Sequence, residues 1–368
     1  MNPSVTTILE DGDILRFTLS GINVSLANGL RRTILSSIDT VVFRTETYAD
    51  NQCTIYENTC RLHNEIIKQR LSSIPIYSTN LETLPGHYVL EVNVTNDSDT
   101  MRIVTTDDFR IKNKESGNYL TDAEVKKIFP PDKITHNYID FVRLRPRLGD
   151  TIPGEKIYLT CEFSIANAKV NAMFNVVSKC SYGNTPDITK AKDRWEQIEQ
   201  RLASEGSTKE EIEFQKTNFR VLDAERSYIA DSFDFVIQTL GVFDNKDIVT
   251  KACYVLQQKF AEIIEKIDSN EIPIHISETT VENSYDVILK DEDYTVGKII
   301  EYILYEKYYK DETATYCGFK KVHPHDTQSI IRIAYKEPTD KHLCREHLKT
   351  VCNDARDIFI RIYKIFKP

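Results

Sequence analysis

The sequence predicts an α+β protein made of two related halves, with a strand-rich insert in the first half. Both halves contain short segments in which polar and apolar residues alternate, as in half-buried strands. Both halves also end in an apolar stripe that persists over about six helical turns. Such a helix needs a partner to cover it, and a second half in the same chain is always nearby. We therefore predict an intramolecular pseudo-dimer, in which each unit pairs a sheet with a long amphipathic helix.

Composition excludes several classes of protein. The chain has 368 residues and a formal net charge of −9, so a main role in gripping a phosphate backbone is not expected. No run approaches the ~20 apolar residues of a membrane span, and the first residues lack the pattern of a secretory signal. The eight cysteines form no C-x-x-C pair, which is typical of reduced thiols. We expect an intracellular protein, cytoplasmic or nuclear, without a membrane partner.

The segment from Ser25 to Ile38 predicts the first helix, with Ser25 as its N-cap. Its apolar residues recur at four-residue steps and form one stripe: Leu26, Leu30, Ile34 and Ile38. Arg31 and Arg32 lie on other faces, while Asn28 and Gly29 keep the adjoining surface small enough for a second backbone to approach. By itself, the segment is as compatible with a purely structural helix, in which a core stripe has a solvated basic flank, as with a functional contact.

The other elements of the first half follow from local patterns. Alternation predicts strands, helical spacing predicts helices, and Pro/Gly punctuation separates the strands of the insert. In order, we expect a strand at 14–19, a strand at 41–48, a helix at 59–72, an extended region at 81–182, a charged surface helix pair at 187–214 broken near Gly206, a strand at 227–243 and a long helix at 245–267.

The second half repeats this order without the insert. We expect a strand at 284–292, a helix at 294–309, a turn at 317–326, a strand at 329–337 and a long final helix. The resulting partition is a first unit at 1–40 and 183–268, a β-rich insert domain at 41–182, a linker at 269–278 and a second unit at 279–368.

Motifs in both halves resemble one family. The pattern NxSLANxLRRxxL from Asn23 to Leu35 is similar to the signature of the α-like subunits of multisubunit RNA polymerases: bacterial α, its archaeal D counterpart and the third-largest subunit of RNA polymerase II. The segments FVRLRPRLGD and SFDFVIQTLGVFDNKDIV are also similar to it. In the second half, GFKKVHPH and SIIRIAY resemble the small α-like partner, known as L in archaea, and the eleventh subunit of RNA polymerase II. The resemblance covers nearly all of the chain except about 183–215.

This resemblance implies a noncatalytic assembly platform of a DNA-dependent RNA polymerase, formed by two fused α-like dimerisation units. The partners it implies are the largest and second-largest subunits and small zinc-binding subunits, with DNA and RNA contacted only through the complex. If the motif has the same role here as in that family, the resemblance implies four residues at or near the contact with the second-largest subunit: Asn28, Arg31, Arg32 and Thr33. No catalytic, cofactor or metal residues and no obligatory homo-oligomer are expected.

The fusion is similar to an arrangement in large nucleocytoplasmic DNA viruses, and we expect a viral transcription subunit. Such a protein would act in the host-cell cytoplasm or virus factory, with the virion as a further location. Two alternatives stay open. One is a free-standing α+β enzyme or ligand-binding protein whose site lies in the insert domain, and the other is a homodimeric scaffold outside transcription.

Other clusters have structural interpretations. Some relatives carry a cysteine-rich metal site in the insert, but the extended stretch 81–182 of this insert has only Cys161 and, at its edge, Cys180. A metal site on the last helix is not favoured, because its histidines are five residues apart and its cysteines lie near the apolar stripe. The residues of that set are His342, Cys344, His347 and Cys352.

Two charged groups also need an interpretation. Glu292 and Asp293 immediately precede a predicted helix, so we expect them to cap it rather than to act as catalytic carboxylates. Arg143, Arg145 and Arg147 alternate along a strand and share one face. Subunit contact, solvation and nucleic-acid contact are all compatible with that trio.

Overall fold

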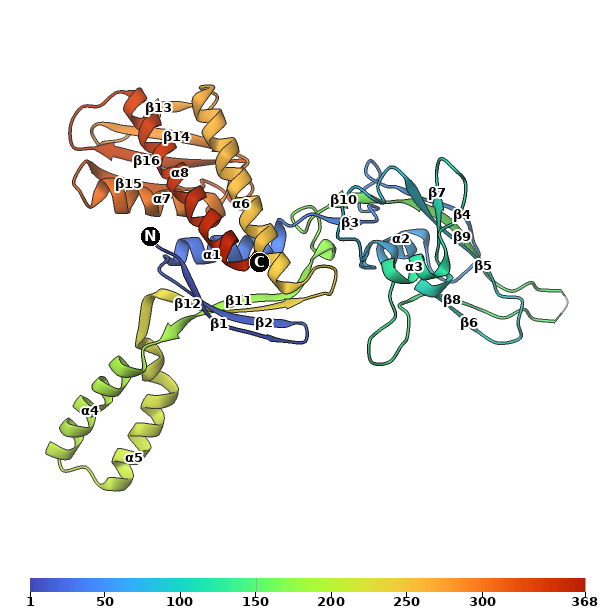
Figure 1. Ribbon diagram of the computed structural model, residues 1–368, viewed down its shortest axis with the longest axis horizontal. Helices are drawn as coiled ribbons and strands as arrows, with labels where there is room; N and C mark the ends of the chain where they lie inside the picture. Colours follow the sequence, from blue (N-terminus) through green and yellow to red (C-terminus); the bar gives the residue numbers. More distant parts are fainter. Residues whose placement is uncertain (150, 368) are drawn as a thin grey trace. The chain divides into compact units, whose positions relative to one another are not determined.

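The computed structural model describes residues 1–149 and 151–367. Its mixture of helices and strands confirms the predicted α+β class (Figure 1). By contacts the chain divides into two compact units. The larger contains Met1–Thr33, Lys179–Gln238 and the chain from Val249 onward, and the smaller contains Ile34–Ser178 with Thr239–Ile248. The insert domain predicted at 41–182 overlaps the smaller unit, except that 179–182 belong to the larger one.

The first sheet of the larger unit has the strand order β1-β2-β12-β11. Its strands are β1 (Ser4–Asp11), β2 (Ile14–Ser20), β11 (Val177–Pro186) and β12 (Tyr228–Thr239). Phe17 and Phe235 lie opposite each other on β2 and β12, and their rings stack with centroids 5.1 Å apart. Helix α1 (Val24–Ser36) follows β2, and helix α6 (Asn245–Asp268) follows β12.

The second sheet has the order β13-β14-β16-β15. Its strands are β13 (Ile274–Ile276), β14 (Ser284–Lys290), β15 (Ala314–Lys320) and β16 (Gln328–Tyr335). Helix α7 (Tyr294–Leu304) follows β14 and continues into a π-helical turn at Tyr305–Tyr309, and helix α8 (Lys341–Phe366) follows β16. In both sheets the four strands are therefore arranged in the order first, second, fourth, third.

Some expectations for individual elements were wrong. Residues 317–320, expected to begin a turn, belong to strand β15, which pairs with β16. The segment 269–278, expected to be a linker, contains β13 at the edge of the second sheet. The strand expected at 41–48 is reduced to three residues, Thr40–Val42. β1 was missed because it is exposed along nearly its whole length, so no alternation marks it.

The long helices α6 and α8 bury their apolar stripes inside the larger unit. Phe260 on α6 stacks on Phe359 of α8, with ring centroids 6.2 Å apart, and Gln257 Nε2 donates to the Phe359 carbonyl at 3.3 Å. Near the end of α8, the ring of Phe366 packs edge to face with that of Phe17 in the first sheet, with centroids 4.9 Å apart. Helices from the two halves of the sequence therefore share one apolar core.

The smaller unit is rich in short strands, as the pattern of its sequence indicates. Its main sheet has the order β4-β9-β5-β7, and two pairs, β10-β3 and β6-β8, complete it. The elements are β3 (Thr40–Val42), β4 (Cys53–Asn58), β5 (Tyr88–Thr95), β6 (Arg102–Thr105), β7 (Arg110–Asn113), β8 (Asp140–Leu144), β9 (Lys156–Glu162), β10 (Ser164–Ala166), α2 (Asn64–Ser72) and α3 (Asp122–Ile128). Phe109 packs edge-on against Phe129 and Phe141 in its core.

The charged segment after β11 forms the expected helix pair. Helix α4 (Ile188–Ser204) and helix α5 (Lys209–Asn218) are joined by a turn in which Gly206 has φ +81°, a conformation that glycine adopts readily. Short π-helical and 3₁₀ turns at Phe219–Asp223 and Ala224–Arg226 lead from α5 to β12. Among the described residues, no helix is long and apolar enough to cross a membrane.

An ion pair joins the two central strands of the second sheet. Asp286 on β14 lies opposite Arg332 on β16. Arg332 donates from Nε and Nη2 to the two carboxylate oxygens at 2.6 and 2.7 Å. These hydrogen bonds favour the charged carboxylate and lower the pKa of Asp286. The bidentate geometry makes this pair a measurable contributor to stability.

We expect Asp286→Asn to lower the free energy of unfolding by about 1–2 kcal/mol at pH 7. The carboxylate stabilises the fold above its unfolded pKa of about 3.9, and this contribution is lost as the pH falls through the lower folded pKa. Urea unfolding at pH 7 and near pH 3 should therefore show a smaller difference at the acidic pH. Asp193→Asn, at an exposed site on α4, is the control, and an equal loss at both pH values would contradict the interpretation.

Candidate partner interface

Helix α1 carries the predicted apolar stripe on its buried face. Leu26, Leu30 and Ile34 are all fully buried. The helix begins one residue before the expected cap, because the Asn23 side chain accepts from the Ser25 backbone N–H at 2.9 Å. Asn23, rather than Ser25, therefore caps α1, a role for which both residue types are suited.

Gly29 marks a close approach between α1 and helix α7 of the second half. A Cβ atom at Gly29 would lie 2.6 Å from Cδ1 of Ile299 and 3.6 Å from the Thr295 carbonyl oxygen. Real Cβ atoms essentially never approach a neighbour that closely, so any larger residue would push Ile299 away. The small surface beside Arg31 and Arg32 thus admits a second helix of the same chain.

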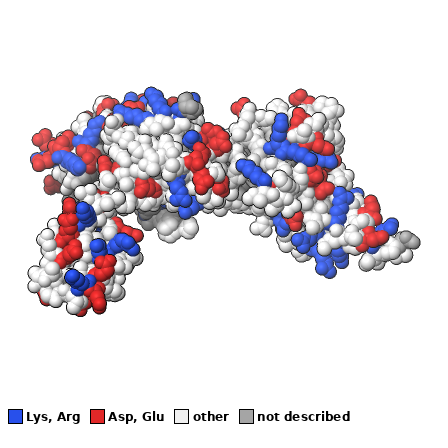
Figure 2. Space-filling view, turned by 60° about the horizontal axis from the view of Figure 1, so that its bottom comes forward, with Lys and Arg blue, Asp and Glu red and all other residues white. Residues whose placement is uncertain are grey.

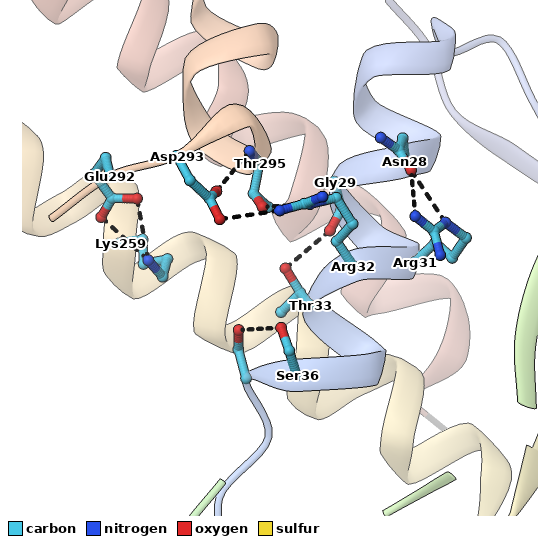
Figure 3. A network of polar contacts seen from close by, with 11 residues as sticks. Asn28, Gly29, Arg31, Arg32, Thr33, Ser36, Lys259, Glu292, Asp293 and Thr295 are labelled. Atoms are coloured by element: carbon cyan, nitrogen blue, oxygen red, sulfur yellow. Dashed lines mark hydrogen bonds and ion pairs between the residues drawn. The ribbon is translucent and has the colours of Figure 1, made fainter. Parts of the chain in front are cut away.

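Arg32 joins α1 to the beginning of α7 (Figure 3). Its Nε donates to Thr295 Oγ1 at 2.9 Å, and its Nη2 lies 3.0 Å from Asp293 Oδ2. The other oxygen of Asp293 accepts from the Thr295 backbone N–H at 2.8 Å and caps α7. Asp293 is therefore a helix cap, as the sequence suggested. Glu292 instead pairs with Lys259 of α6 at 3.1 Å.

The other predicted contact residues differ in accessibility. Arg31 donates from Nε and Nη2 to the Asn28 side-chain oxygen at 3.0 and 2.9 Å, and both residues are half-buried (Figure 3). Thr33 is only 1% exposed, and its hydroxyl donates to the Gly29 carbonyl at 2.9 Å. The structure thus places Asn28 and Arg31 in contact on α1, both half-buried, Arg32 partly exposed against α7, and Thr33 in the interior.

Arg31 lies close to strand β11, where its positive charge acts to lower the pKa of Cys180 and of Tyr182. Burial raises the pKa of Cys180 to about 12, and the guanidinium of Arg31 opposes that shift only in part. Tyr182 responds in the same way, with burial raising its pKa. Both groups are therefore neutral at physiological pH, and Cys180 is not a reactive thiolate. Among the described residues, no carboxylate lies within 4.0 Å of Arg31.

The histidine and cysteine residues of the last helix have structural surroundings. Cys344 and Cys352 are fully buried in the apolar face of α8, and burial raises the pKa of Cys344 to about 11. The His347 ring stacks on Tyr308 with centroids 3.9 Å apart. Within the described ranges, no three His, Cys, Asp or Glu side chains are placed to hold a metal ion together.

The basic trio of the smaller unit is matched by carboxylates. Arg145 pairs with Glu155, Arg147 lies 3.0 Å from Asp99, and Arg143 lies 3.6 Å from Asp140. Figure 2 shows acidic and basic side chains interspersed over the face that it draws. This pairing favours subunit contact or solvation over phosphate binding, which requires unbalanced positive charge.

The hollows of the insert offer little support for the ligand-binding alternative. One cavity of about 90 Å³ lies beside Asp107, Arg110 and Tyr138, which is well below the ~300 Å³ at which small-molecule sites begin. A larger, open hollow of about 480 Å³ is lined only by the loop at 95–102, which contains neither histidine nor cysteine. Among the described residues that line these hollows, no hydroxyl is hydrogen-bonded to a carboxylate, as an activated nucleophile would be.

Comparison with known proteins matches the chain to one protein family and to several of its named members. The model of the RNA polymerase Rpb3/Rpb11 dimerisation domain matches residues 16–260. The chain is 24% identical over 288 residues to DNA-directed RNA polymerase subunit Rpo3 of Methanosphaera stadtmanae, covering 71% of this chain and 97% of that protein. It is 22% identical over 314 residues to subunit RPAC1 of RNA polymerases I and III of Mus musculus, covering 74% and 86%. A conjugation stage-specific protein of Tetrahymena thermophila is 24% identical over 303 residues, covering 69% and 91%.

We expect Gly29→Ala to destabilise the chain only mildly, by about 1 kcal/mol, because the atom it meets is the end of a movable side chain and alanine is the better helix former. The added Cβ would collide with Cδ1 of Ile299. Ile299→Val removes that carbon atom, so Gly29→Ala should be much less harmful in the Ile299→Val background. Urea unfolding of the four proteins in a double-mutant cycle measures this coupling. Additive effects would show that α1 does not press against Ile299.

Proposed function

Because the chain belongs to the RNA polymerase Rpb3/Rpb11 dimerisation-domain family, we propose that it is a noncatalytic assembly subunit of DNA-directed RNA polymerase on which the two large catalytic subunits dock. The observation that carries this proposal is the family match over residues 16–260, together with relatives that are named polymerase subunits. A platform needs rigid surfaces rather than a reactive centre. The buried thiols of Cys180, Cys344 and Cys352, whose pKa values burial raises, and the hollow of about 90 Å³ in the insert are compatible with that role.

We further propose that the chain joins two α-like units into one pseudo-dimer, with a β-rich insert in the first. The repeated strand order and the α6–α8 contact between Phe260 and Phe359 support this arrangement. The alignment with Rpo3 of M. stadtmanae uses 97% of that protein but only 71% of this chain, and the family match ends at residue 260. The second sheet and helix α8 lie beyond that residue, as expected if a second unit has been added to an Rpo3-like chain.

The proposed docking site for the second-largest subunit includes Asn28 and Arg31 on α1. Asn28 holds Arg31 through two of its N–H groups, and the remaining donors suit a carboxylate or backbone carbonyl of a partner. Arg32, which is partly exposed, would then hold α1 against α7 beside the site, and the buried Thr33 would support it from the interior. Small zinc-binding subunits are further proposed neighbours, and nucleic acid would be reached only through the complex. The proposed compartment is the one in which that polymerase transcribes, cytoplasmic or nuclear.

The two rival functions have less support. A homodimeric scaffold would need an apolar face left uncovered, but α6 and α8 cover each other within one chain. A free-standing enzyme would need a site in the insert, where the hollow beside Asp107 holds only about 90 Å³ and the larger one is open and lined without histidine or cysteine. Nucleotidyl transfer by the isolated chain would favour the enzyme and contradict the platform.

We expect the paired change Asn28→Ala with Arg31→Glu to reduce recovery of the second-largest subunit at least about tenfold in co-purification. Reversing the charge of Arg31 and removing its support should weaken docking without disturbing the buried stripe of α1. Co-expression of the tagged chain with both large subunits from the same source, followed by mass spectrometry and a nucleotide-incorporation assay, measures the effect.

The matched control for this test is Arg61→Glu with Asn118→Ala, two exposed positions in the smaller unit. Thermal melting should be unchanged in both paired variants. Undiminished recovery of the large subunits with the α1 variant would refute the proposed docking site. Where that variant melts early, Arg31→Gln provides a milder change at the same position.

A further inference from the structure

The α4–α5 hairpin is an addition to the repeated unit. In the second half, only residues 321–327, seven in number, connect the third strand to the fourth. In the first half the equivalent connection runs from residue 187 to residue 227, which is 41 residues, and contains α4 and α5. The two sheets nevertheless have the same strand order. The hairpin is therefore not needed to complete its sheet, and we looked for a role that its own surface suggests.

An apolar groove lies at the base of this hairpin. Its volume is about 430 Å³, and the rings of Trp195 and Phe219, with centroids 5.5 Å apart, form part of its lining. Ile188 and Ala191 on α4 add further apolar surface. Ile188 is 79% exposed, which is unusual for a large aliphatic side chain beside an apolar depression. We call this depression the hairpin groove.

The hairpin groove contains an unsatisfied donor. Trp195 is only 7% exposed, and its indole Nε1 is buried without a hydrogen-bond partner among the described residues. Leaving a buried N–H unpaired is unfavourable by about 1–3 kcal/mol, and folded proteins rarely do so. A small movement of the side chains over it would let the backbone carbonyl of a bound chain accept this hydrogen bond. The unpaired indole is thus a second observation, independent of the apolar lining.

The charges around the hairpin groove indicate the kind of ligand. Lys216 and Arg220 line it and are exposed, and no carboxylate of the described chain lies within 4.0 Å of either. Lys192 lies 3.9 Å from Glu196 in an exposed pair, which is worth little. Two carboxylates also line the groove: Asp187 accepts from the Lys190 backbone N–H and caps α4, and Glu225 is exposed. Lys192, Lys216 and Arg220 outnumber Asp187 and Glu225, so the lining carries a net charge of +1 beside an apolar surface.

Nucleic acid and anionic membranes are less suitable ligands. Residues 187–227 contain ten acidic and eight basic side chains, so the hairpin as a whole is negatively charged. Phosphate backbones and anionic lipids need an extended basic surface. A short acidic peptide with one apolar anchor needs only a local positive rim and an apolar pocket.

We propose that the hairpin groove binds a short segment of a different polypeptide, in which an apolar anchor side chain stands beside acidic residues. The anchor fills the groove over Trp195 and Phe219, the acidic residues pair with Lys216 and Arg220, and a backbone carbonyl accepts from the indole. This proposal is independent of the docking site on α1. It assigns the hairpin to a regulatory or accessory protein rather than to the sheet that carries it.

Selection from a random peptide library displayed on phage, against the purified full-length chain, tests the proposal. The enriched peptides should combine a large apolar residue with Asp or Glu. Trp195 is the single tryptophan of the chain, so its emission reports binding at the groove directly. Titration with a synthetic enriched peptide should change that emission in a saturable way.

Two pairs of variants locate the site. Lys216→Glu with Arg220→Glu should weaken peptide binding about tenfold or more, whereas Arg201→Glu with Lys209→Glu, exposed and outside the groove, should not. Ile188→Ser should also weaken binding, whereas Phe214→Ser should not, because Phe214 is 64% exposed but does not line the groove. All of these changes are at exposed positions, and circular dichroism checks that the fold is retained.

Several results would overturn the proposal. These are the absence of any enriched peptide, enrichment without an acidic preference, and equal binding by the groove and control variants. A change in Trp195 emission on adding a single-stranded RNA oligonucleotide or vesicles of phosphatidylserine, in the absence of a response to peptide, would assign the groove to those ligands instead.

Discussion

The contact between α6 and α8 is the constraint on which the larger unit depends. Each helix has an apolar stripe too long to be covered by a single four-stranded sheet. Stacking Phe260 on Phe359 joins the two stripes, and Phe366 continues the core to Phe17 of the first sheet. Burial of such side chains is worth about 1.5–3 kcal/mol each, so separating the helices would expose more apolar surface than a domain of this size tolerates.

A second contact fixes how the halves meet. Gly29 allows α1 to approach α7, and Arg32 reaches the capped end of α7 through Thr295 and Asp293. The same short motif therefore has two physical roles. Its small and buried residues hold the chain together, while Asn28 and Arg31 stay at the surface. A motif that resembles a polymerase-subunit signature can accordingly reflect internal assembly as much as contact with another subunit.

The repeated strand order also distinguishes the elements common to both halves of the chain from those added to the first half. The strand-rich insert and the α4–α5 hairpin both enter the first unit, and neither interrupts its sheet. Added elements that leave a core intact are free to acquire their own partners, because the stability of the core does not depend on them. The exposed Ile188 and the unpaired Trp195 indole belong to such an element.

The sequence by itself determined the α+β class, the long helices and the helix pair broken at Gly206, because periodicity and glycine report local structure directly. It missed β1 and β13, since edge strands lack a buried face that would impose alternation. Only the tertiary structure decided the surroundings of the four motif residues, Asn28, Arg31, Arg32 and Thr33. Local spacing put Arg31, Arg32 and Thr33 on one helix, but which of them faces α7, the interior or solvent depends on residues more than 250 positions away, such as Thr295.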